Sequence, residues 1–315
     1  MSDIEEKIRE EAKKALEDGK AAMVIGWGAG SVPFRTTPVF IENPDDVGKL
    51  VWNPACTNNL AVYLPKMAKD RKVAIVAKPC DIRSIVALIQ ENQVKRENLY
   101  IIGLGCAGVV DPSRFEEKGI RLPSITGIEW VDGKIKVIIQ DGEQLVAPED
   151  CLREMCLACT KREPAMFDVK FGEAVLPVEP KPRELPELPE ERRKYWSEQF
   201  SKCIRCYACR QICPNCYCEV CFADRVEPKW TAKKAVPEEN WMFHATRAMH
   251  LAGRCVQCGE CERVCPVGIR IAELMREMAE AVKKKYDYEA GDPNEEAPLL
   301  GTFRENDVDP AQHSE

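Results

Sequence analysis

One cysteine pattern occurs twice in this chain of 315 residues, and it restricts the fold more than any other feature. The pattern is C-x2-C-x2-C-x3-C-P, which runs from Cys203 to Pro214 and again from Cys255 to Pro266. Its first three cysteines share one tight loop, and the fourth stands beside a proline where a helix can begin. Runs of this kind hold two 4Fe-4S clusters, and each run supplies the fourth ligand of the other cluster.

The repeat therefore predicts two cross-ligated clusters in the C-terminal part of the chain. We expect the ligands of the first cluster to be Cys203, Cys206, Cys209 and Cys265. We expect the ligands of the second cluster to be Cys255, Cys258, Cys261 and Cys213. Zinc is the alternative metal because it also binds C-x-x-C pairs, but it needs two such pairs and not a third cysteine at the same step.

Charged side chains accompany the two cysteine runs. Positive charge near a cluster should raise its reduction potential. The basic residues next to the runs are Lys202, Arg205, Arg210 and Arg254. His244 and His250 precede the second run, and we expect them to be packed or surface histidines. No Ser/His/Asp array and no paired carboxylates stand out, so we expect no catalytic residue.

The composition excludes several other classes of protein. The chain has 17 cysteines, an odd number that cannot pair completely within one chain. Its start is charged and amphipathic without the apolar core of a signal peptide, and no apolar run approaches the length of a membrane span. The net charge of −7 argues against a nucleic-acid partner. We therefore expect a cytoplasmic metalloprotein rather than a disulfide-stapled one.

The N-terminal part alternates strands with helices. We expect helices at residues 3–18 and 82–90, and buried strands at 22–27, 73–77 and 100–104. Such alternation is typical of an α/β domain with a parallel core. A hairpin signal, Asp132-Gly133, precedes an apolar stretch at 134–140 and predicts an appended antiparallel piece. The predicted fold class is an α/β (α+β) N-terminal domain with an open mixed sheet, followed by a small, mostly helical, dicluster ferredoxin-like domain.

Five prolines between Leu176 and Glu190 mark the expected domain boundary. We expect no helix in this stretch, and two helices beyond it, at 241–252 and 271–285. The predicted organisation is a domain at 1–175, a proline-rich linker at 176–195, a dicluster domain at 196–286 and an acidic tail at 287–315. The tail has few apolar residues, so we expect it to be disordered or to extend over a partner.

Six further cysteines are spread over the N-terminal domain. Cys80 and Cys106 each follow a predicted strand, and sites in open α/β sheets gather outside the carboxyl ends of strands. Cys156-x-x-Cys159 adds a pair, so these four residues could bind a third cluster. Cys56 and Cys151 are alternate ligands. The competing interpretation is that all six are inert, buried cysteines.

Three more cysteines, Cys216, Cys218 and Cys221, follow the first run and exceed what two clusters require. One interpretation makes them ligands of a fourth cluster, and the other makes them spare thiols packed near the clusters. The sequence leaves the two interpretations equal.

Two glycine-rich segments are candidates for binding a nucleotide cofactor. Gly103 to Gly108 matches G-x-G-x-x-G, but Pro112 follows too soon for the long helix of a dinucleotide site. Gly26, Gly28 and Gly30 follow a predicted strand and precede Val32-Pro33. They are weak candidates for contacts with a flavin phosphate, and a simple turn is the alternative.

Several segments together resemble a known family. The segments are KPCDIRSI around Cys80, IIGLGCAG around Cys106, and Cys156-x-x-Cys159 followed by Asp168 to Gly172. In this order they resemble the beta subunits of coenzyme F420-reducing hydrogenases and formate dehydrogenases, from about residue 20 to 285. The C-terminal half resembles their dicluster ferredoxin extension, which sulfhydrogenase-type beta subunits share.

The resemblance implies an electron-transfer subunit of a multisubunit oxidoreductase in an anaerobe, of hydrogenase, formate dehydrogenase, heterodisulfide-reductase-like or aldehyde oxidoreductase type. It implies a third 4Fe-4S cluster on Cys80, Cys106, Cys156 and Cys159, and partners that are other subunits and a carrier such as ferredoxin. The alternative is an FAD-containing reductase of ferredoxin, a nicotinamide or the deazaflavin. The family's glycine-rich flavin segment is reduced here to GWGAGS, which speaks against FAD.

Overall fold

The N-terminal half of the chain is built on a five-stranded mixed sheet. The computed structural model describes residues 3–32, 34–181, 184–294 and 299–303. The strand order is β2-β1-β3-β4-β8, with β2 antiparallel at one edge and the other four strands parallel. The strands are β1 (Met23–Ala29), β2 (Thr36–Ile41), β3 (Val73–Ala77), β4 (Leu99–Leu104) and β8 (Val169–Phe171). The expected mixed sheet with a parallel core is confirmed.

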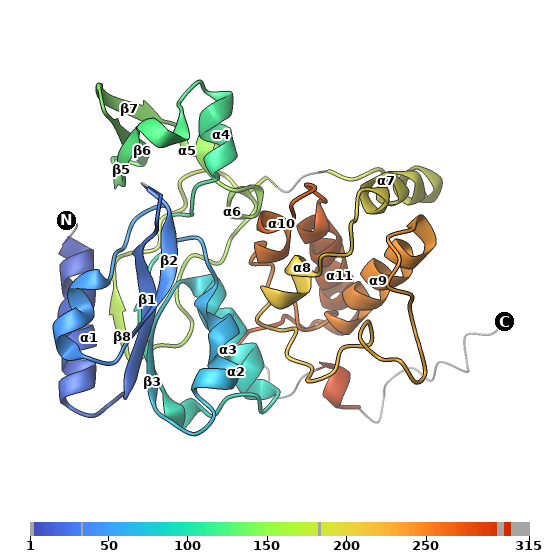
Figure 1. Cartoon of the computed structure of the whole chain (residues 1–315), viewed down its shortest axis with the longest axis horizontal. Coiled ribbons are helices and arrows are strands. Elements are labelled where there is room, and N and C mark those ends of the chain that lie inside the picture. Colours follow the sequence, from blue (N-terminus) through green and yellow to red (C-terminus); the bar gives the residue numbers. More distant parts are fainter. Residues whose placement is uncertain (1–2, 33, 182–183, 295–298, 304–315) are drawn as a thin grey trace.

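Helices cover both faces of this sheet (Figure 1). α1 (Asp3–Glu17) lies on one face, because Ile8, Ala12 and Ala15 form a buried stripe at helical spacing. α2 (Leu64–Met67) and α3 (Pro79–Gln90) lie on the other face, toward the C-terminal helices. Burial of both sheet faces explains why β3 reads as an uninterrupted apolar run.

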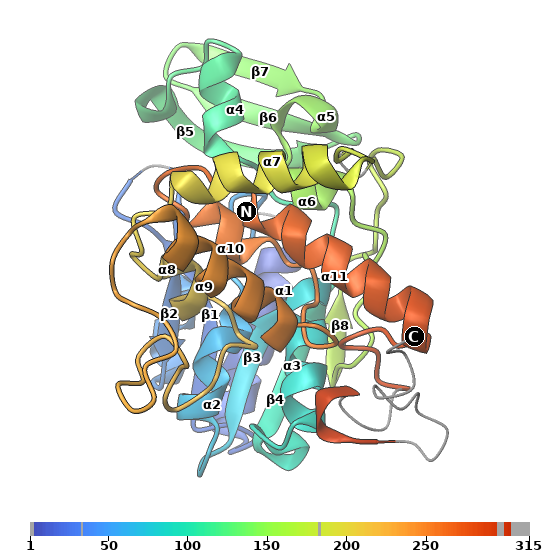
Figure 2. The ribbon, with the colours of Figure 1, turned by 90° about the vertical axis from the view of Figure 1, so that its right-hand side faces the viewer.

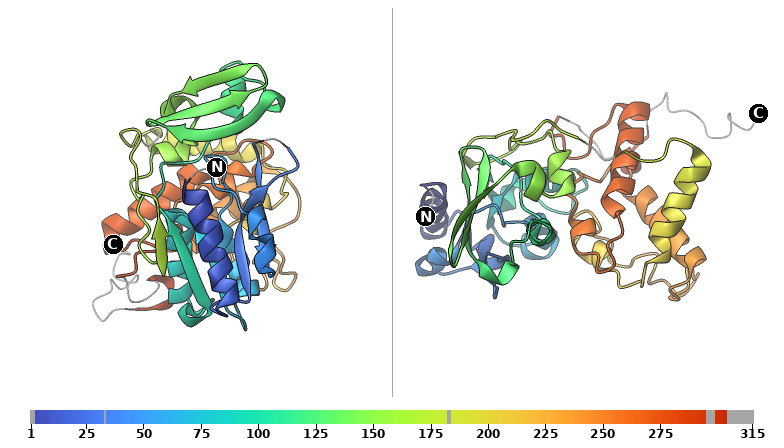
Figure 3. Two further views of the ribbon diagram at one scale, coloured as in Figure 1. Left: turned by 90° about the vertical axis from the view of Figure 1, so that its left-hand side faces the viewer. Right: turned by 90° about the horizontal axis from the view of Figure 1, so that it is seen from above.

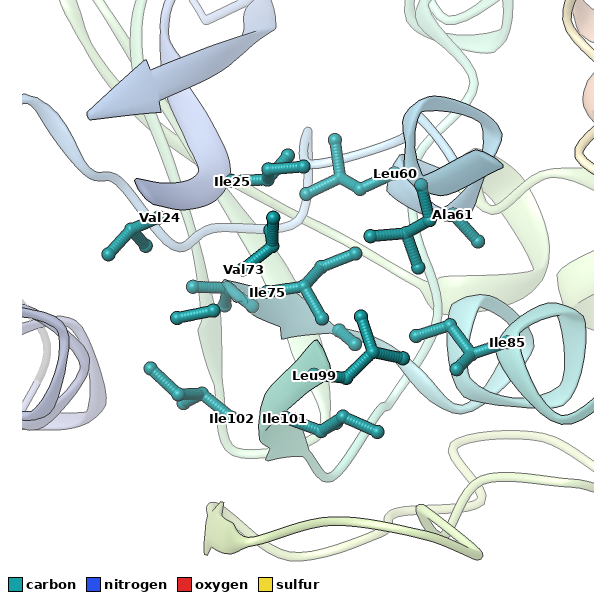
Figure 4. Packing of buried hydrophobic residues seen from close by; sticks show 14 of the residues in the cluster. Val24, Ile25, Leu60, Ala61, Val73, Ile75, Ile85, Leu99, Ile101 and Ile102 are labelled. Atoms are coloured by element: carbon teal, nitrogen blue, oxygen red, sulfur yellow. The ribbon is translucent and has the colours of Figure 1, made fainter. Parts of the chain in front are cut away.

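Successive residues of the central strands pack on opposite sides of the sheet (Figure 4). Val24 and Ile102 point toward α1. Ile25 and Ile101 point the other way, where they meet the side chains of the short helix Leu60–Tyr63 and of α3. One hydrophobic core therefore runs through the sheet and places the carboxyl ends of β3 and β4 beside each other.

A small antiparallel sheet is appended to this core, as the hairpin signal predicts. Its strands are β5 (Ile125–Val131), β6 (Lys134–Ile139) and β7 (Gly142–Val146). Asp132 and Gly133 both have positive φ, +47° and +75°, as a two-residue type I′ turn requires. The sheet packs with α4 (Pro112–Glu117) and α5 (Pro148–Cys151) around a separate apolar cluster (Figure 3).

The C-terminal part is helical and packs on a core of its own. Three long helices, α7, α9 and α11, form the outer side of this part (Figure 2), and the two short helices α8 and α10 of the cysteine runs lie on the side that faces the N-terminal half (Figure 1). Their bounds are α7 Pro189–Ser201, α8 Ala208–Gln211, α9 Pro237–His250, α10 Glu260–Arg263 and α11 Ile271–Tyr286. The remaining helices are α6 (Glu154–Leu157) and the 3-10 turns Pro44–Lys49, Leu60–Tyr63, Arg96–Asn98, Leu122–Ser124 and Leu299–Gly301.

Two expectations need correction. The expected linker at 176–195 ends sooner, because α7 begins at Pro189; proline is well suited to the first turn of a helix, where its missing N–H costs nothing. The expected tail at 287–315 is partly packed on its own chain, since Tyr288 and Ala290 are buried and Arg83 donates to the Ala290 carbonyl at 2.9 Å. Residues 295–298 and 304–315 of that tail lie outside the described residues.

No helix within the described residues is long and apolar enough to cross a membrane.

Candidate metal centres

The two cysteine runs fold into the same local shape. In the first run Arg205 and Tyr207 have φ of +57° and +60°, and in the second Gln257 and Gly259 have φ of +60° and +72°. These pairs occupy equivalent positions around the middle cysteine of each run. In both loops the N–H two residues after the first cysteine points at its sulfur, at 3.4 Å from Cys203 and 3.4 Å from Cys255. In each loop two left-handed residues flank the middle cysteine, so the two loops turn in the same way.

The second predicted ligand set lines one cavity. The wall of this cavity contains Cys213 from the first run together with Cys255, Cys258 and Cys261 from the second. Burial raises the pKa of each of the three second-run thiols, and the nearby Cys213 raises all three further. The fold thus brings the cross-ligand Cys213 to the second run, as the sequence repeat predicts.

The first predicted set also lies together. Burial raises the pKa of Cys209 to about 11, with further contributions from Cys203 and Cys265. The Cys203 thiol has Cys206 and Cys265 as neighbours. Cys206 is exposed, whereas Cys209 is buried. The first set is therefore nearer the protein surface than the second.

The N-terminal set gathers at the carboxyl ends of β3 and β4. Cys80 is the second residue of α3, and Cys106 follows β4 by two residues. Burial is the main cause of the raised pKa of Cys80, and the nearby Cys258 and Cys106 thiolates add to it. Cys106 has Cys156 as a neighbour, and Cys156 is in turn a neighbour of Cys159. The four thiols expected to form a third site are thus neighbours, next to Cys258 of the second set.

A buried ion pair fixes the start of α3 and so the position of Cys80. The Asp81 carboxylate accepts the Lys78 backbone N–H at 2.9 Å and lies 3.1 Å from Lys78 Nζ. Lys78 Nζ also donates to the Asn58 carbonyl at 2.8 Å and stands 3.9 Å from the centre of the Trp27 ring. Both charged side chains are almost completely buried. The KPCD segment is therefore a rigid element of the site.

The two alternate N-terminal cysteines are in hydrophobic cores instead. Cys56 packs in the main core, and burial raises its pKa to about 12. Cys151 packs under the antiparallel sheet, where its thiol donates to the Ala147 carbonyl at 3.2 Å. Neither residue has another cysteine among its main electrostatic neighbours. The structure places both apart from the N-terminal set.

The three additional cysteines lie along a groove of about 940 Å³ between the two halves of the chain. They have different neighbours. The pKa of Cys216 is lowered by its contact with Cys213 and by Arg247. Cys221 lies beside Arg210. Cys218 is exposed and lies near Arg254. The three thiols share a groove but not a common set of contacts.

Two buried interactions join the N-terminal site to the second cysteine run, and sequence patterns did not reveal them. Arg153 Nη1 donates to Glu260 at 2.9 Å, and Arg153 Nη2 donates to the Gly259 carbonyl at 2.7 Å. On the other side Arg83 donates to the Val256 carbonyl at 3.1 Å. Glu260 lies within the second cysteine run and Arg153 lies near Cys156, but neither position indicates the pairing, because it is made only by the docking of the two halves.

Arg247 of α9 is a further residue absent from the sequence expectations. It is 3% exposed and lines the cavity of the second cysteine set. The available sequence signal is its position on the buried stripe of α9, with Phe243, His244 and Leu251. Its neighbour His244 is stacked on Phe200 at 4.6 Å, and burial lowers the His244 pKa to about 3. His244 is therefore a packed, neutral histidine, as expected.

The glycine candidates for flavin have structural roles in and beside β1. Gly26 and Gly28 lie within β1 rather than after a strand, where an added Cβ would come within 2.3 Å of Leu50 and 2.4 Å of Val39. A Cβ at Gly30 would meet the Arg35 carbonyl at 2.8 Å. These glycines allow close packing of β1. After β4, no helix begins before Pro112, so Gly103 to Gly108 does not form a dinucleotide fold.

The donor sets suit 4Fe-4S clusters. Buried thiols whose pKa values are raised need a positively charged partner to become thiolates, and iron supplies it. The cavity of the second set also contains Arg247, whose Nε and Nη1 have no hydrogen-bond partner. An anionic group in the cavity would accept hydrogen bonds from these two nitrogens. Within the described residues, no three His, Cys, Asp or Glu side chains are placed to hold one metal ion. Cluster ligands bind separate irons, so this spacing is compatible with clusters.

Comparison with known families confirms the resemblance. Residues 70–196 match the family described as the C terminus of the beta subunit of coenzyme F420 hydrogenase/dehydrogenase. Residues 198–269 match the 4Fe-4S dicluster domain. The C-terminal part is therefore similar to 4Fe-4S dicluster domains, as the doubled cysteine run predicts.

Two relatives align along most of their length. The F420-dependent formate dehydrogenase subunit beta of Methanocaldococcus jannaschii is 26% identical over 359 residues, which cover 92% of this chain and 92% of the relative. The subunit beta of F420-dependent formate dehydrogenase 1 of Methanococcus maripaludis is 27% identical and covers 92% of this chain and 91% of its own. A solved F420-reducing NiFe hydrogenase complex of Methanosarcina barkeri aligns with a TM-score of 0.40 and 20% identity, over 49% of this chain and 58% of that chain.

Proposed function

We propose that this chain, which joins a beta-subunit domain of the F420 hydrogenase/dehydrogenase type to a 4Fe-4S dicluster domain, is an electron-transfer subunit of a larger oxidoreductase. It would relay electrons between a catalytic subunit and a carrier. The observation that carries the proposal is the proximity of the N-terminal cysteine set to the second C-terminal run, where Cys80 lines one pocket with Val256 and Gln257. Cys80 and Cys258 come from separate halves of the chain, and yet they are electrostatic neighbours.

The proposed ligands form three sets. Set one is Cys203, Cys206, Cys209 and Cys265. Set two is Cys255, Cys258, Cys261 and Cys213. Set three is Cys80, Cys106, Cys156 and Cys159. We leave Cys216, Cys218 and Cys221 outside the clusters because they have separate neighbours, and Cys56 and Cys151 because they belong to hydrophobic cores. When bound, 4Fe-4S clusters exchange single electrons.

The protein's own contribution is to hold the sets close together and to shield them from water. Arg153 and Glu260 connect the loop before Cys156 to the loop between Cys258 and Cys261. Val256 and Met155 fill the space between set three and set two, where they line a small pocket with Cys80 and Cys159. A fixed junction of this kind keeps the separation of two redox groups constant, so the rate of transfer does not depend on domain motion.

The relatives suggest the kind of complex. Both are named as beta subunits of F420-dependent formate dehydrogenases, so we propose partner subunits of formate dehydrogenase or hydrogenase type. Heterodisulfide-reductase-like and aldehyde oxidoreductase complexes remain the other proposed settings, with ferredoxin or the deazaflavin as carrier. The bond chemistry would belong to the partner, and we propose a cytoplasmic location. A flavin-containing reductase is not proposed, because the glycines that motivated it pack inside and next to β1.

The test is the iron and acid-labile sulfide content of the native complex, purified anaerobically, together with acid-released flavin. We expect about twelve irons per chain, four for each set. Electron paramagnetic resonance during turnover of the complex should show the clusters of this chain being reduced. A colourless protein with stoichiometric zinc, or clusters that stay oxidised while the partner subunit turns over its substrate, would refute the relay.

A further inference from the structure

Arg247 lies between the first and second cysteine sets. From α9 its Nη2 donates to the carbonyl of Cys209, a set-one residue, at 3.1 Å. Its side chain also lines the cavity formed by set two, which includes Cys213 and Cys261. Only 3% of the residue is exposed. One guanidinium therefore contacts the surroundings of both sets.

The positive charge of Arg247 has no carboxylate partner. Within the described part of the chain, no acidic side chain forms an ion pair with it, and its Nε and Nη1 donate no hydrogen bond. Two other arginines at this junction do have carboxylate partners. Arg153 is paired with Glu260, and Arg254 with Glu91. An unpaired buried charge is strongly unfavourable, so Arg247 needs an anionic partner that no carboxylate among the described residues supplies.

The sulfur atoms of the cysteine sets are in position to be that partner. Arg247 lines one cavity with Cys213 and Cys261, and it donates to the carbonyl of Cys209. All three cysteines belong to the proposed ligand sets. A loaded cluster carries net negative charge together with its thiolates, and it also offers sulfur atoms as hydrogen-bond acceptors.

We propose that Arg247 is the shared counter-cation of both C-terminal clusters and that it sets both reduction potentials. This inference rests on the proposed iron–sulfur function. A fixed positive charge stabilises the more negative, reduced form of a neighbouring group, so Arg247 raises the potential of each cluster. Its two unpartnered donor nitrogens, Nε and Nη1, add hydrogen bonds to sulfur, which also raise the potential. Arg247 is thus a positioning residue that acts on two redox groups at once.

The experiment compares Arg247→Met and Arg247→Lys in the intact complex. Met removes the charge and the donors, whereas Lys keeps the charge but not the planar fork of N–H groups. Arg276→Met is the matched control, because Arg276 of α11 already has a carboxylate partner, Glu280, at 2.6 Å. Potentiometric titration followed by electron paramagnetic resonance measures the two potentials, and iron analysis measures loading.

We expect Arg247→Met to lower the reduction equilibrium constants of both clusters at least tenfold, which is about 59 mV for a one-electron couple. Arg247→Lys should give a smaller fall, and Arg276→Met no fall. If Arg247→Met loses its iron, the inference is still tested by Arg247→Lys, whose Fe–S stretching frequencies in resonance Raman spectra should also shift. A loaded Arg247→Met protein with both potentials unchanged, or with only one changed, would overturn the inference. Wild-type protein without iron would instead overturn the proposed function.

Discussion

The guanidinium of Arg153 and the carboxylate of Glu260 form a 2.9 Å ion pair, although 107 positions separate them in the sequence. Both side chains are nearly inaccessible to solvent, at 8% and 1% exposure. Glu260 also accepts from Arg263, whereas among the described residues Arg153 has only the Gly259 carbonyl in addition. The pair connects the loop of the N-terminal cysteine set to the loop of set two. Its loss should therefore weaken the packing between the two halves of the chain.

Glu260→Gln should destabilise the protein more than Arg153→Met. In Glu260→Gln the buried Arg153 keeps its charge without a carboxylate, at a cost of about 3–5 kcal/mol. In Arg153→Met the Glu260 carboxylate still has Arg263, so a smaller loss is expected. Anaerobic urea denaturation of the loaded protein measures both. Lys118→Met is the control, because the Lys118–Asp150 pair is exposed and should contribute about 0–1 kcal/mol. Equal losses in all three variants would contradict the expectation.

Gly259 should not tolerate a side chain. Its φ is +72°, and an added Cβ would stand 2.6 Å from Cγ of Met155 in the other half of the chain. Gly268 has a similar φ of +62° but open space around the Cβ position. Gly268→Ala therefore measures the backbone cost alone, about 1 kcal/mol. Gly259→Ala should lose more, and the additional Met155→Ala substitution should recover part of the difference. Denaturation midpoints of the cluster-loaded proteins measure these differences in stability. A Gly259→Ala protein as stable as Gly268→Ala would show that the clash with Met155 is relieved.

Iron content should separate ligand cysteines from packed ones. Cys80→Ala removes a proposed ligand of set three, so the content should fall from about twelve irons per chain toward eight. Cys56→Ala changes a thiol in the main core, and it should keep the full iron content while it loses about 1 kcal/mol or more of stability through the cavity. Iron and sulfide analysis of anaerobically purified protein distinguishes the two. Loss of four irons in Cys56→Ala, with none lost in Cys80→Ala, would show that Cys56 is the ligand and Cys80 the packed cysteine.

Local signals predicted much of the fold. The buried stripe of α1, the apolar run of β3 and the turn at Asp132-Gly133 are each specified within a few residues, and their positions agree closely with the structure. The start of α7 was missed because proline was interpreted as a helix breaker, although at the first turn it favours a helix. The tail was interpreted from its composition, which does not reveal the buried contacts of Tyr288.

The site was predictable where ligands are close in sequence, and only partly so elsewhere. The doubled run specifies sets one and two because the spacing itself is the signal. Cys80 and Cys106 could be related through the rule for parallel strand ends. The Arg153–Glu260 pair could not be predicted from the sequence, because it depends on how the two halves dock. Arg247 was overlooked because a charged residue on a helix is usually at the surface, and here its counter-charge belongs to residues on other loops.

His244 should make the protein less stable at mildly acidic pH. Its folded pKa is about 3, because burial, Arg247 and Arg205 all disfavour the imidazolium. In the unfolded chain its pKa returns to about 6.5. As the pH falls below about 6.5, the unfolded state binds a proton that the folded state does not. The stability contributed by neutral His244 is therefore complete above pH 6.5 and is lost progressively toward pH 3, by about 1.4 kcal/mol per pH unit.

A substitution isolates this contribution. His244→Phe keeps an aromatic ring in the stack with Phe200 and Phe243 and removes the proton-binding site. Between pH 7.5 and 5.5 the wild-type free energy of unfolding should fall by about 1.4 kcal/mol more than that of His244→Phe. His250→Phe, which changes an exposed histidine at the end of the same helix, should follow the wild type. Anaerobic urea denaturation, followed by circular dichroism, measures the pH dependence of the free energy of unfolding for the three proteins. If the free energies of unfolding of His244→Phe and the wild type fall in parallel, His244 binds its proton in the folded protein as well. The conclusion that it is neutral and buried would then be wrong.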